Sequence, residues 1–385
     1  MKIAAYLCLI TLALWAAACG GGPAATQPVA GEGNATLTTG PATSPPSTPA
    51  ASPAPQPTAP PTATLPPITP SPSPTDTPAP TPTQMTAATP TAPTPEPTAA
   101  VLWRLGGVKD VEDAPFTDLG GLDVAGERVY VADRSGGVRI FDLAGEYQGQ
   151  ISAGEIGYLT DVKAGPDGTV YIADAALHQI TMFNADLDLL GGFGAAGSGE
   201  GEFGSNSPTA LAVSPDGEVF VLDPNVDANG QPVTRVLVFS ATGDFLRSFP
   251  AEPGPDAVGM DVGPDGTLFI VNRQGYVAEV EPAAGRLIQR LGEDVLADAW
   301  PRMIAVDDAG NLYVTTQIPT VVIVLSAQGH SLIERIGEEG VRTDEGWPEG
   351  EFLSPFGIAV TGDGRRVFAG DTADPFSYVT AFERR

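Results

Sequence analysis

The sequence predicts an all-β fold, a six-bladed β-propeller of four-stranded blades over residues 101–385, preceded by a signal peptide and a disordered linker. A repeated unit of short apolar strands is the first observation behind this prediction. The second strand of each unit ends at Asp133, Asp174, Asp223, Asn272, Thr316 and Asp371, at spacings of 41 to 55 residues. Six copies at that spacing are typical of propeller blades. The second observation is a proline-rich stretch before the repeats that cannot bury a core.

The first 18 residues have the pattern of a signal peptide. Lys2 gives a positive start, and residues 3–18 form an apolar run that is short for a membrane span. The run Ala16-Ala17-Ala18-Cys19 resembles the lipobox of bacterial lipoproteins, although Ala16 stands where that family usually has Leu. The resemblance implies that residues 1–18 are removed and that Cys19 is acylated. An ordinary signal peptide and a retained single anchor are the alternatives.

Residues 19–100 are expected to be the lipidated N-terminus and a disordered stalk. Residues 23–100 hold 23 of the 39 prolines and 19 threonines, mostly as Thr-Pro and Ser-Pro units. Such units favour extended polyproline II structure. We therefore expect a protein anchored in a cell membrane by its N-terminal lipid alone. Its propeller would face outside the cytoplasm, at the cell surface or in the periplasm.

The charge of the chain lies almost entirely in the repeats. The first 100 residues hold one of the 19 basic and three of the 47 acidic residues, so residues 101–385 carry a formal charge of −26. Such a surface repels phosphate backbones, which argues against a nucleic-acid partner and against binding to anionic lipid headgroups. Cationic ligands, metal ions and neutral glycans stay open.

The residues of each repeated unit predict the strands and turns of one blade. First strands begin at Gly121, Asp161, Ala210, Gly259, Met303 and Gly357, and the clearest copies of the first two strands are residues 210–223 and 259–272. An Asp-Gly turn or a relative joins the first strand to the second, and it suits a tight hairpin because Gly tolerates positive φ. Val-Tyr-Val and Leu-Phe-Ile segments have the β-branched and aromatic residues that strands prefer.

Several segments resemble NHL repeats. Residues 201–213 and 350–360 resemble that family's glycine–phenylalanine–proline entry into the first strand, and Arg139-Ile140-Phe141-Asp142 resembles its third-strand ending. The resemblance covers essentially all of residues 101–385 and implies a β-propeller, commonly of six blades.

The two ends of the repeat region predict how the ring closes. The sixth unit stops after its third strand, so its fourth strand is missing from the C-terminal end. Residues 101–106 resemble the fourth strands of other units, so we expect them to complete blade six. Closure of this kind protects strand edges that would otherwise be open. We expect the domain to be monomeric.

The strand-terminal aspartates are interpreted as architecture. Asp133, Asp174, Asp223 and Asp371 recur at one position of most units. Such a residue can accept hydrogen bonds from backbone amides of the next turn, so its repetition does not indicate catalysis.

Residues that break the repeat are the better binding candidates. Beside the start of each first strand, the blades carry Gly120, Thr160, Thr209, Val258, Arg302 and Phe356, which should surround the mouth of the channel. Arg302, beside Trp300, is expected to be a lone cation in an acidic surface, and Tyr158, Trp300 and Phe356 are aromatic. With Asp161, these residues predict a pocket suited to a protein, peptide or glycan. The alternative is that the aromatic residues pack between blades.

Two features could bind a metal. Asp223, Asn225, Asp227 and Asn229 alternate oxygen ligands as Ca²⁺ loops do, although the glycine and the twelfth position do not match, and a long hairpin explains the pattern equally well. Asp161 and Asp256 lie near the inner ends of the predicted channel and could bind a divalent metal.

No catalytic residue is predicted. The two histidines, His178 and His330, should lie on opposite faces, and no Gly-x-Ser-x-Gly motif occurs. We therefore expect a binding or scaffold propeller rather than an enzyme. The alternative is a metal-dependent lactonase or lyase of the gluconolactonase or streptogramin-lyase type, in which only His178 could serve as the face histidine.

Overall fold

The computed structural model describes residues 99–108, 116–134, 136–152, 157–227, 229–252, 254–327 and 331–385. The expected signal peptide, Cys19, most of the linker and His330 lie outside these residues. Among the residues that are described, no helix is long and apolar enough to cross a membrane.

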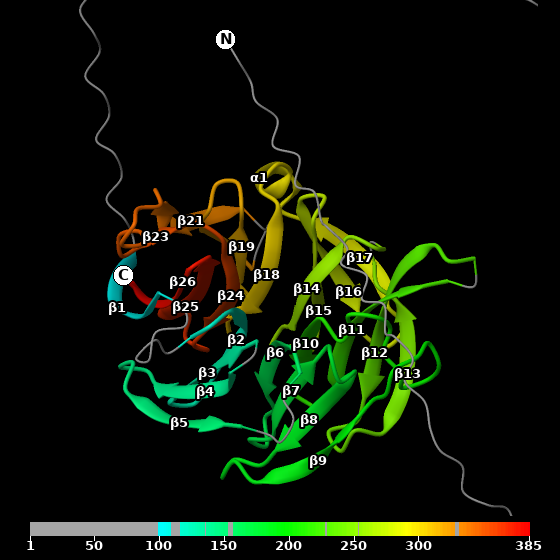
Figure 1. Ribbon diagram of the computed structural model, residues 1–385. Helices are drawn as coiled ribbons and strands as arrows, with labels where there is room; N and C mark the ends of the chain where they lie inside the picture. The colour runs from blue at the N-terminus through cyan, green and yellow to red at the C-terminus, as the bar shows by residue number, and fades with distance from the viewer. Residues whose placement is uncertain are drawn as a thin grey trace, which may run out of the picture. The chain divides into compact units, whose positions relative to one another are not determined.

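Six antiparallel four-stranded sheets form an all-β six-bladed propeller around a central axis (Figure 1). The innermost strands are β2 (Leu119–Ala125), β6 (Leu159–Ala164), β10 (Ala210–Val213), β14 (Ala257–Val262), β18 (Pro301–Val306) and β24 (Pro355–Val360). The second strands are β3 (Arg128–Asp133), β7 (Val170–Asp174), β11 (Val219–Val226), β15 (Leu268–Asn272), β19 (Leu312–Thr316) and β25 (Arg366–Ala373).

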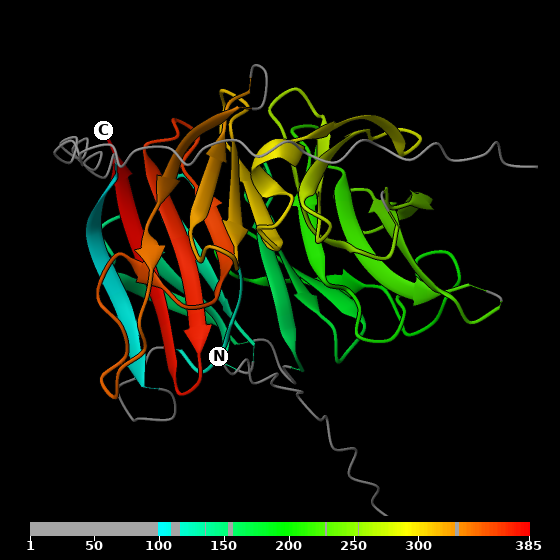
Figure 2. The ribbon, with the colours of Figure 1, turned by 90° about the horizontal axis from the view of Figure 1, so that it is seen from above.

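The outer half of each blade completes the sheet, as the side view in Figure 2 shows. The third strands are β4 (Gly137–Asp142), β8 (Gln179–Phe183), β12 (Pro232–Phe239), β16 (Tyr276–Glu281), β20 (Val322–Leu325) and β26 (Phe376–Arg384). The outermost strands are β5 (Tyr147–Ile151), β9 (Leu189–Phe193), β13 (Phe245–Pro250), β17 (Arg286–Leu291), β21 (Leu332–Ile336) and β1 (Ala99–Val108). The connections also contain α1 (Glu293–Leu296) and the parallel pair β22 (Glu338–Glu339) and β23 (Glu351–Phe352).

The ring closes as the sequence predicts. Strand β1 pairs antiparallel with β26, from Ala99 opposite Arg384 to Val108 opposite Phe376, so the first described strand is the outer strand of the last blade. The Trp103 indole nitrogen donates a hydrogen bond of 3.1 Å to the carbonyl of Leu143 in the first blade. This strand therefore joins blade six to blade one as well as completing blade six.

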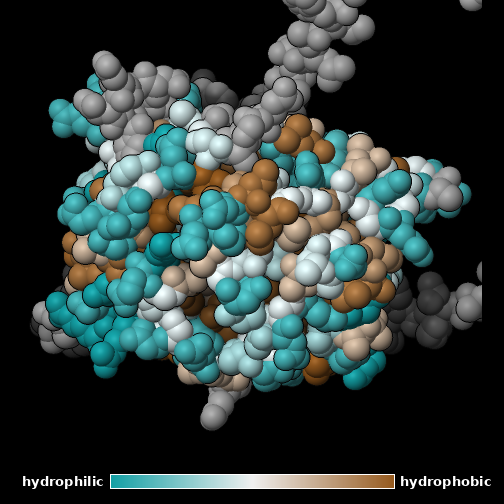
Figure 3. All heavy atoms as spheres, turned by 90° about the horizontal axis from the view of Figure 1, so that it is seen from below, coloured by the Kyte–Doolittle hydropathy of each residue, from teal (hydrophilic) through white to brown (hydrophobic). Residues whose placement is uncertain are grey.

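Aromatic residues of the second strands fill the space between neighbouring blades. Tyr130, Tyr171, Phe220, Phe269, Tyr313 and Phe368 are all buried, and each belongs to a cluster with residues of the following blade. Outer strands expose single apolar residues such as Leu189 and Leu190. One side of the ring accordingly mixes hydrophilic and apolar residues (Figure 3). The inter-blade aromatics carry most of the stacking because a blade cannot bury its faces alone.

The Pro-Asp-Gly turns explain why the inner hairpins are tight. Gly168, Gly217 and Gly266 have φ of 84° to 85°, a conformation that residues with a Cβ rarely adopt. Each donates its amide to the carbonyl three residues earlier. These turns lie at the end of the inner strands that is remote from the segments preceding each blade.

The strand-terminal aspartates are architectural, as expected, but their main partners differ from the expectation. Asp133, Asp174, Asp223 and Asp371 are buried, and each accepts backbone amide hydrogen bonds from the segment that precedes the first strand of its own blade. Asp174 also accepts bonds from the next turn, at Ala176 and Leu177, and among the described residues it is the only one of the four that does so. These carboxylates therefore fix the segments that lead into the innermost strands.

Candidate functional site

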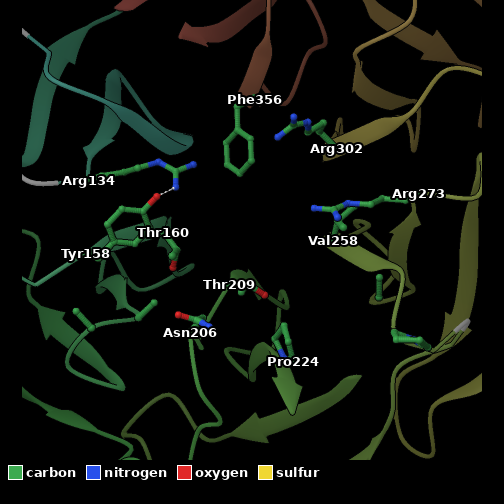
Figure 4. Close-up of a pocket in the computed structure, with 14 residues that line it drawn as sticks. Arg134, Tyr158, Thr160, Asn206, Thr209, Pro224, Val258, Arg273, Arg302 and Phe356 are labelled. Carbon is green, nitrogen blue, oxygen red and sulfur yellow. Dashed lines mark hydrogen bonds between the residues drawn. The ribbon is translucent and has the colours of Figure 1, made fainter. Parts of the chain in front are cut away.

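A pocket of about 550 Å³ lies at the channel end where the innermost strands begin (Figure 4). Ligand pockets commonly have volumes of about 300–1,000 Å³. Its walls come from two sets of positions, one at or just before the start of the first strands and one directly after the repeated second-strand motif, and each set draws on several blades. These segments meet because the strand-terminal aspartates bond the first set to the second strands.

The first set contains most of the residues aligned in the sequence. Thr160, Thr209, Val258, Arg302 and Phe356 line the pocket, and Tyr158 and Asn206 join them from the same segments. The Thr160 hydroxyl donates to the carbonyl of Pro208 at 2.8 Å, which ties blade two to blade three beneath the pocket. Gly120, aligned with these positions in blade one, is not among the lining residues.

The second set was not expected from the sequence. Arg134, Ala175, Pro224 and Arg273 line the pocket, and each directly follows the last residue of the repeated second-strand motif. The signal was present in the repeat, because a residue after the strand-terminal Asp or Asn faces the same end of the ring as the segments before the first strands. Aligning this position across blades would have identified both arginines.

Three arginines therefore surround the pocket, which corrects the expectation that Arg302 is a lone cation. The guanidinium groups of Arg134, Arg273 and Arg302 come from blades one, four and five and point toward the open centre (Figure 4). None of the residues lining this pocket is Asp, Glu, His or Cys. The local charge is thus opposite in sign to that of the domain.

Arg134 is held in place by several partners. Its Nε donates to the carbonyl of Leu119 at 2.9 Å, its Nη1 donates to the Tyr158 hydroxyl, and the Asp118 carboxylate lies 3.8 Å away. Its guanidinium carbon lies 5.0 Å from the centre of the Tyr158 ring. Arg134 is therefore positioned before any ligand arrives, with part of its charge already balanced.

Among the described residues, Arg302 and Arg273 lack the hydrogen-bond and ion-pair partners that Arg134 has. Within the described part of the chain, no carboxylate forms an ion pair with either guanidinium. Burial lowers the pKa of Arg302, and the charges of Arg273 and Arg134 lower it further. An anion between these groups would relieve the repulsion and form charge-assisted hydrogen bonds.

Phe356 supplies a flat apolar surface between two of the arginines. Its ring centre lies 4.9 Å from the guanidinium carbon of Arg134 and 5.6 Å from that of Arg302. Guanidinium groups over an aromatic face gain cation–π attraction, and their N–H edges remain free for hydrogen bonds. The ring thus orients two cations toward the same space.

A smaller cavity of about 170 Å³ adjoins the pocket and is lined by Arg273, Trp300, Pro301, Arg302 and Gln317. Trp300, expected at the channel mouth, lies here and does not line the larger pocket. Its side chain is 59% exposed, and its φ of 48° falls in the left-handed region that non-glycine residues rarely occupy. The Gln317 amide, within 3.3 Å of the Trp300 carbonyl, helps to fix this conformation.

Asp161 does not belong to the pocket, contrary to expectation. It is fully buried, and its two carboxylate oxygens accept the backbone amides of Val162 at 2.9 Å and Leu211 at 2.8 Å. Burial raises the pKa of Asp161 to about 7. Its role is to join the innermost strands of blades two and three.

The channel below the pocket holds a buried lysine among carboxylates. The Lys163 ammonium lies 3.6 Å from the Asp123 carboxylate and 3.5 Å from that of Asp261. Those two aspartates also accept the amides of Ala164 and Val306 in the neighbouring blades. The ammonium also interacts with the carboxylate of Asp161, one of the two expected metal ligands. Asp256, the other expected metal ligand, bonds to Gln274 at 2.7 Å.

The expected Ca²⁺ loop is the extended hairpin of β11 and β12. Asp223 bonds to Arg235 at 2.7 Å and to the Gly204 amide, and it lies at the buried end of the hairpin. Asp227 Oδ1 accepts the amides of Asn229 and Gln231, and Asn225 accepts the amide of Val226. The oxygens are used within the turn, and the described residues contain no group of three acidic, His or Cys side chains suited to a metal.

His178 lies in the turn between β7 and β8 with φ of 52°, and it is not among the residues lining the pocket. Its Nδ1 is buried and has no hydrogen-bond partner among the described residues. The structure therefore does not bring His178 together with the arginines.

Comparisons with known proteins support the fold. No protein-family model and no curated protein matches the chain. Among solved structures, a streptogramin B lyase is similar over 73% of this chain and 98% of its own, with 12% identity and a TM-score of 0.50. A gluconolactonase from Xanthomonas campestris is similar over 74% of this chain and 89% of its own, with 16% identity and a TM-score of 0.52. At these identities the likeness establishes the six-bladed propeller and no activity.

Proposed function

We propose that this protein is a ligand-binding propeller whose arginine-lined pocket takes an anionic ligand or the anionic group of a larger one. The observation that carries the proposal is the set of three guanidinium groups around one cavity with no carboxylate among its lining residues. In a domain with a charge of −26, chance placement would favour acidic lining residues. Bidentate arginine contacts suit carboxylate, phosphate and sulfate groups alike.

The proposal extends to the location of the propeller. The signal-peptide pattern and Cys19 support a lipid anchor, with the Pro- and Thr-rich stalk holding the binding domain outside the cytoplasm. Incorporation of labelled palmitate into the chain should be lost in Cys19→Ala. Retention of the label in that variant would contradict the anchor.

Anion binding can be tested with ligand pairs in which the anionic group is removed or made neutral. The full chain, purified in detergent, would be melted with phenylphosphate against phenol, benzoate against benzamide, and an acidic trisaccharide against its methyl ester. Ligand that binds only the folded protein raises stability by about 2.7 kcal/mol at one hundred times Kd. We expect at least one anion to raise the melting temperature by several degrees while its neutral partner does not.

The variants place this effect in the pocket. The double substitution Arg273→Gln with Arg302→Gln should abolish the shift. Arg286→Gln should keep the shift. Arg286 is exposed on β17 and lies opposite Glu281 of β16 in the strand register, at the end of the blade remote from the pocket. Equal shifts for anionic and neutral partners, or an unchanged shift in the double variant, would overturn the proposal.

A lactonase or lyase activity is the second candidate, and the propeller fold shared with the two enzymes supports it. It ranks second because three arginines repel a divalent cation and the pocket lining offers no carboxylate or imidazole as a general base. Turnover of a sugar lactone, lost in Arg302→Gln, would reverse this order.

A further inference from the structure

The ligand chemistry can be narrowed further, on the basis of the proposed anion-binding function. The larger and smaller cavities share Arg273 and Arg302, so these two guanidinium groups stand where the cavities join. An anionic group held between them would leave room for the ligand to continue on both sides. The arrangement favours an extended ligand over a compact anion.

Each of the two cavities has an exposed aromatic ring. Trp300 is 59% exposed beside the smaller cavity, and Tyr158 is 42% exposed at the larger one. The hydrogen bond from Arg134 holds the Tyr158 hydroxyl, and the hydrogen bond from the Gln317 backbone amide to the Trp300 carbonyl holds the backbone that carries the Trp300 side chain. Solvent-facing rings provide flat apolar surfaces on which the C–H face of a sugar ring can lie.

The remaining polar groups are neutral. Asn206 and Thr209 line the larger cavity, and Gln317 lines the smaller one. Amide and hydroxyl groups both donate and accept hydrogen bonds, as sugar hydroxyls require. Aromatic surfaces, neutral polar groups and separated cations therefore occur together along one continuous site.

The spacing of charge distinguishes the anion. The arginines come from three different blades, and Arg134 already bonds to Tyr158 and Leu119. Of the three pocket arginines, Arg273 and Arg302 form no ion pair with a described carboxylate. Two free guanidinium groups can hold one carboxylate, so the site suits a ligand chain whose carboxylates are spaced along it. A polyanion with more charge than one carboxylate per sugar, such as a polyphosphate, would be repelled more strongly by the domain, which carries a charge of −26.

From these observations, we infer that the pocket binds an acidic oligosaccharide. A uronate carboxylate lies between Arg273 and Arg302, and a neighbouring sugar ring lies on Trp300. Recognition then depends on both the charge and the aromatic surface, and loss of either weakens binding.

The test is titration calorimetry of the full chain with tetrasaccharides of galacturonate, glucuronate, mannuronate and guluronate. Their methyl esters, a neutral maltotetraose, phenylphosphate and a tetraglutamate peptide are the comparison ligands. At least one acidic tetrasaccharide should bind ten times or more tightly than its own methyl ester and than the other comparison ligands. Trp300→Ala should weaken that binding at least tenfold, and Trp300→Phe should restore most of it.

The outcomes separate the two proposals. Binding of phenylphosphate or tetraglutamate through Arg273 and Arg302, without a preference for any uronate, would overturn the oligosaccharide proposal and leave the anion-binding function intact. Equal binding of a uronate and its methyl ester, or full affinity in Trp300→Ala, would also overturn the oligosaccharide proposal. Failure of every anion would remove both proposals. Arg286→Gln is the control variant, because it loses one positive charge outside the pocket. It should bind the acidic tetrasaccharide with the same affinity as the unaltered chain.

Discussion

Arg302 shows what could and could not be predicted for single residues. Its position before a first strand follows from the repeat, so the sequence places it near the channel mouth. Its partners do not follow, because Arg134 and Arg273 come from blades one and four and meet it only when the ring closes. A charge that looks isolated along the chain is therefore one of three in space.

Asp161 illustrates the same limit at a buried position. The sequence places it at the start of a first strand but cannot show that one oxygen accepts the Val162 amide of its own strand while the other accepts the Leu211 amide of the next blade. The close packing explains the adjacent glycine, since a Cβ on Gly121 would overlap the Asp161 carboxylate. The residue serves the stacking of the blades and not the ligand.

Asp161 should make stability depend on pH. Burial raises its pKa from 3.8 to about 7 in the folded chain, so the native state binds the proton more tightly than the unfolded state. Stability contributed by this group is therefore greatest near pH 4 and falls as pH rises toward 7. Between these values, the free energy of unfolding of the unaltered chain should decrease relative to Asp161→Asn by about 1 kcal/mol or more.

Chemical denaturation at several pH values measures this difference. Asp371, whose pKa burial raises to about 6, is present in both chains, so its contribution cancels in the comparison. Parallel pH profiles for the two chains would show that Asp161 does not titrate in this range.

At the scale of elements, the strands and their order were largely predictable. Alternating β-branched and aromatic residues, Asp-Gly turns and the sixfold spacing depend on local chemistry, and the six blades and the closing strand β1 are confirmed. Five of the six first strands start two residues earlier than expected, for example at Leu119, Leu159 and Pro301, and the first strand of blade three starts at Ala210 as expected. The roles of the connecting segments were harder to predict. Arg273, for example, lines the pocket only because segments of other blades lie across the channel from it.

Closure by β1 should contribute measurably to stability. The Trp103 ring packs 5.7 Å from Phe368 between ring centres, and its indole nitrogen bonds to Leu143 of the first blade. Trp103→Ala removes both contacts and should lower the free energy of unfolding by about 3 kcal/mol. Leu102→Ala is the matched control, because this neighbouring side chain is 40% exposed, and the change should cost about 0.5 kcal/mol or less.

Urea denaturation of the three chains compares these values. Equal midpoints for Trp103→Ala and the unaltered chain would mean that the ring does not depend on this contact between blades six and one.

At the scale of the whole domain, net charge and local charge differ in sign. A charge of −26 argues against a nucleic-acid partner, and it also suggested cationic or neutral ligands. The pocket instead concentrates guanidinium groups, and an acidic surface around a cationic mouth directs small anions to that mouth alone. Composition averages over the surface and cannot show such a separation.

Binding of an anion at this mouth should weaken with salt. Raising NaCl from about 0.1 M to about 1 M shortens the Debye length from about 10 Å to about 3 Å, so Kd should rise about tenfold. Titrations of Arg286→Gln should show the same slope, while the double variant of Arg273 and Arg302 should show little salt dependence. A Kd that does not change with salt would indicate that the ligand is held without its charge.

The most direct test of the arginine-lined pocket is a crystal structure of the chain with a bound acidic tetrasaccharide. The account predicts a carboxylate within hydrogen-bond distance of both Arg273 and Arg302, with a sugar ring against Trp300. A ligand seated elsewhere on the ring, with both guanidinium groups facing solvent, would contradict it.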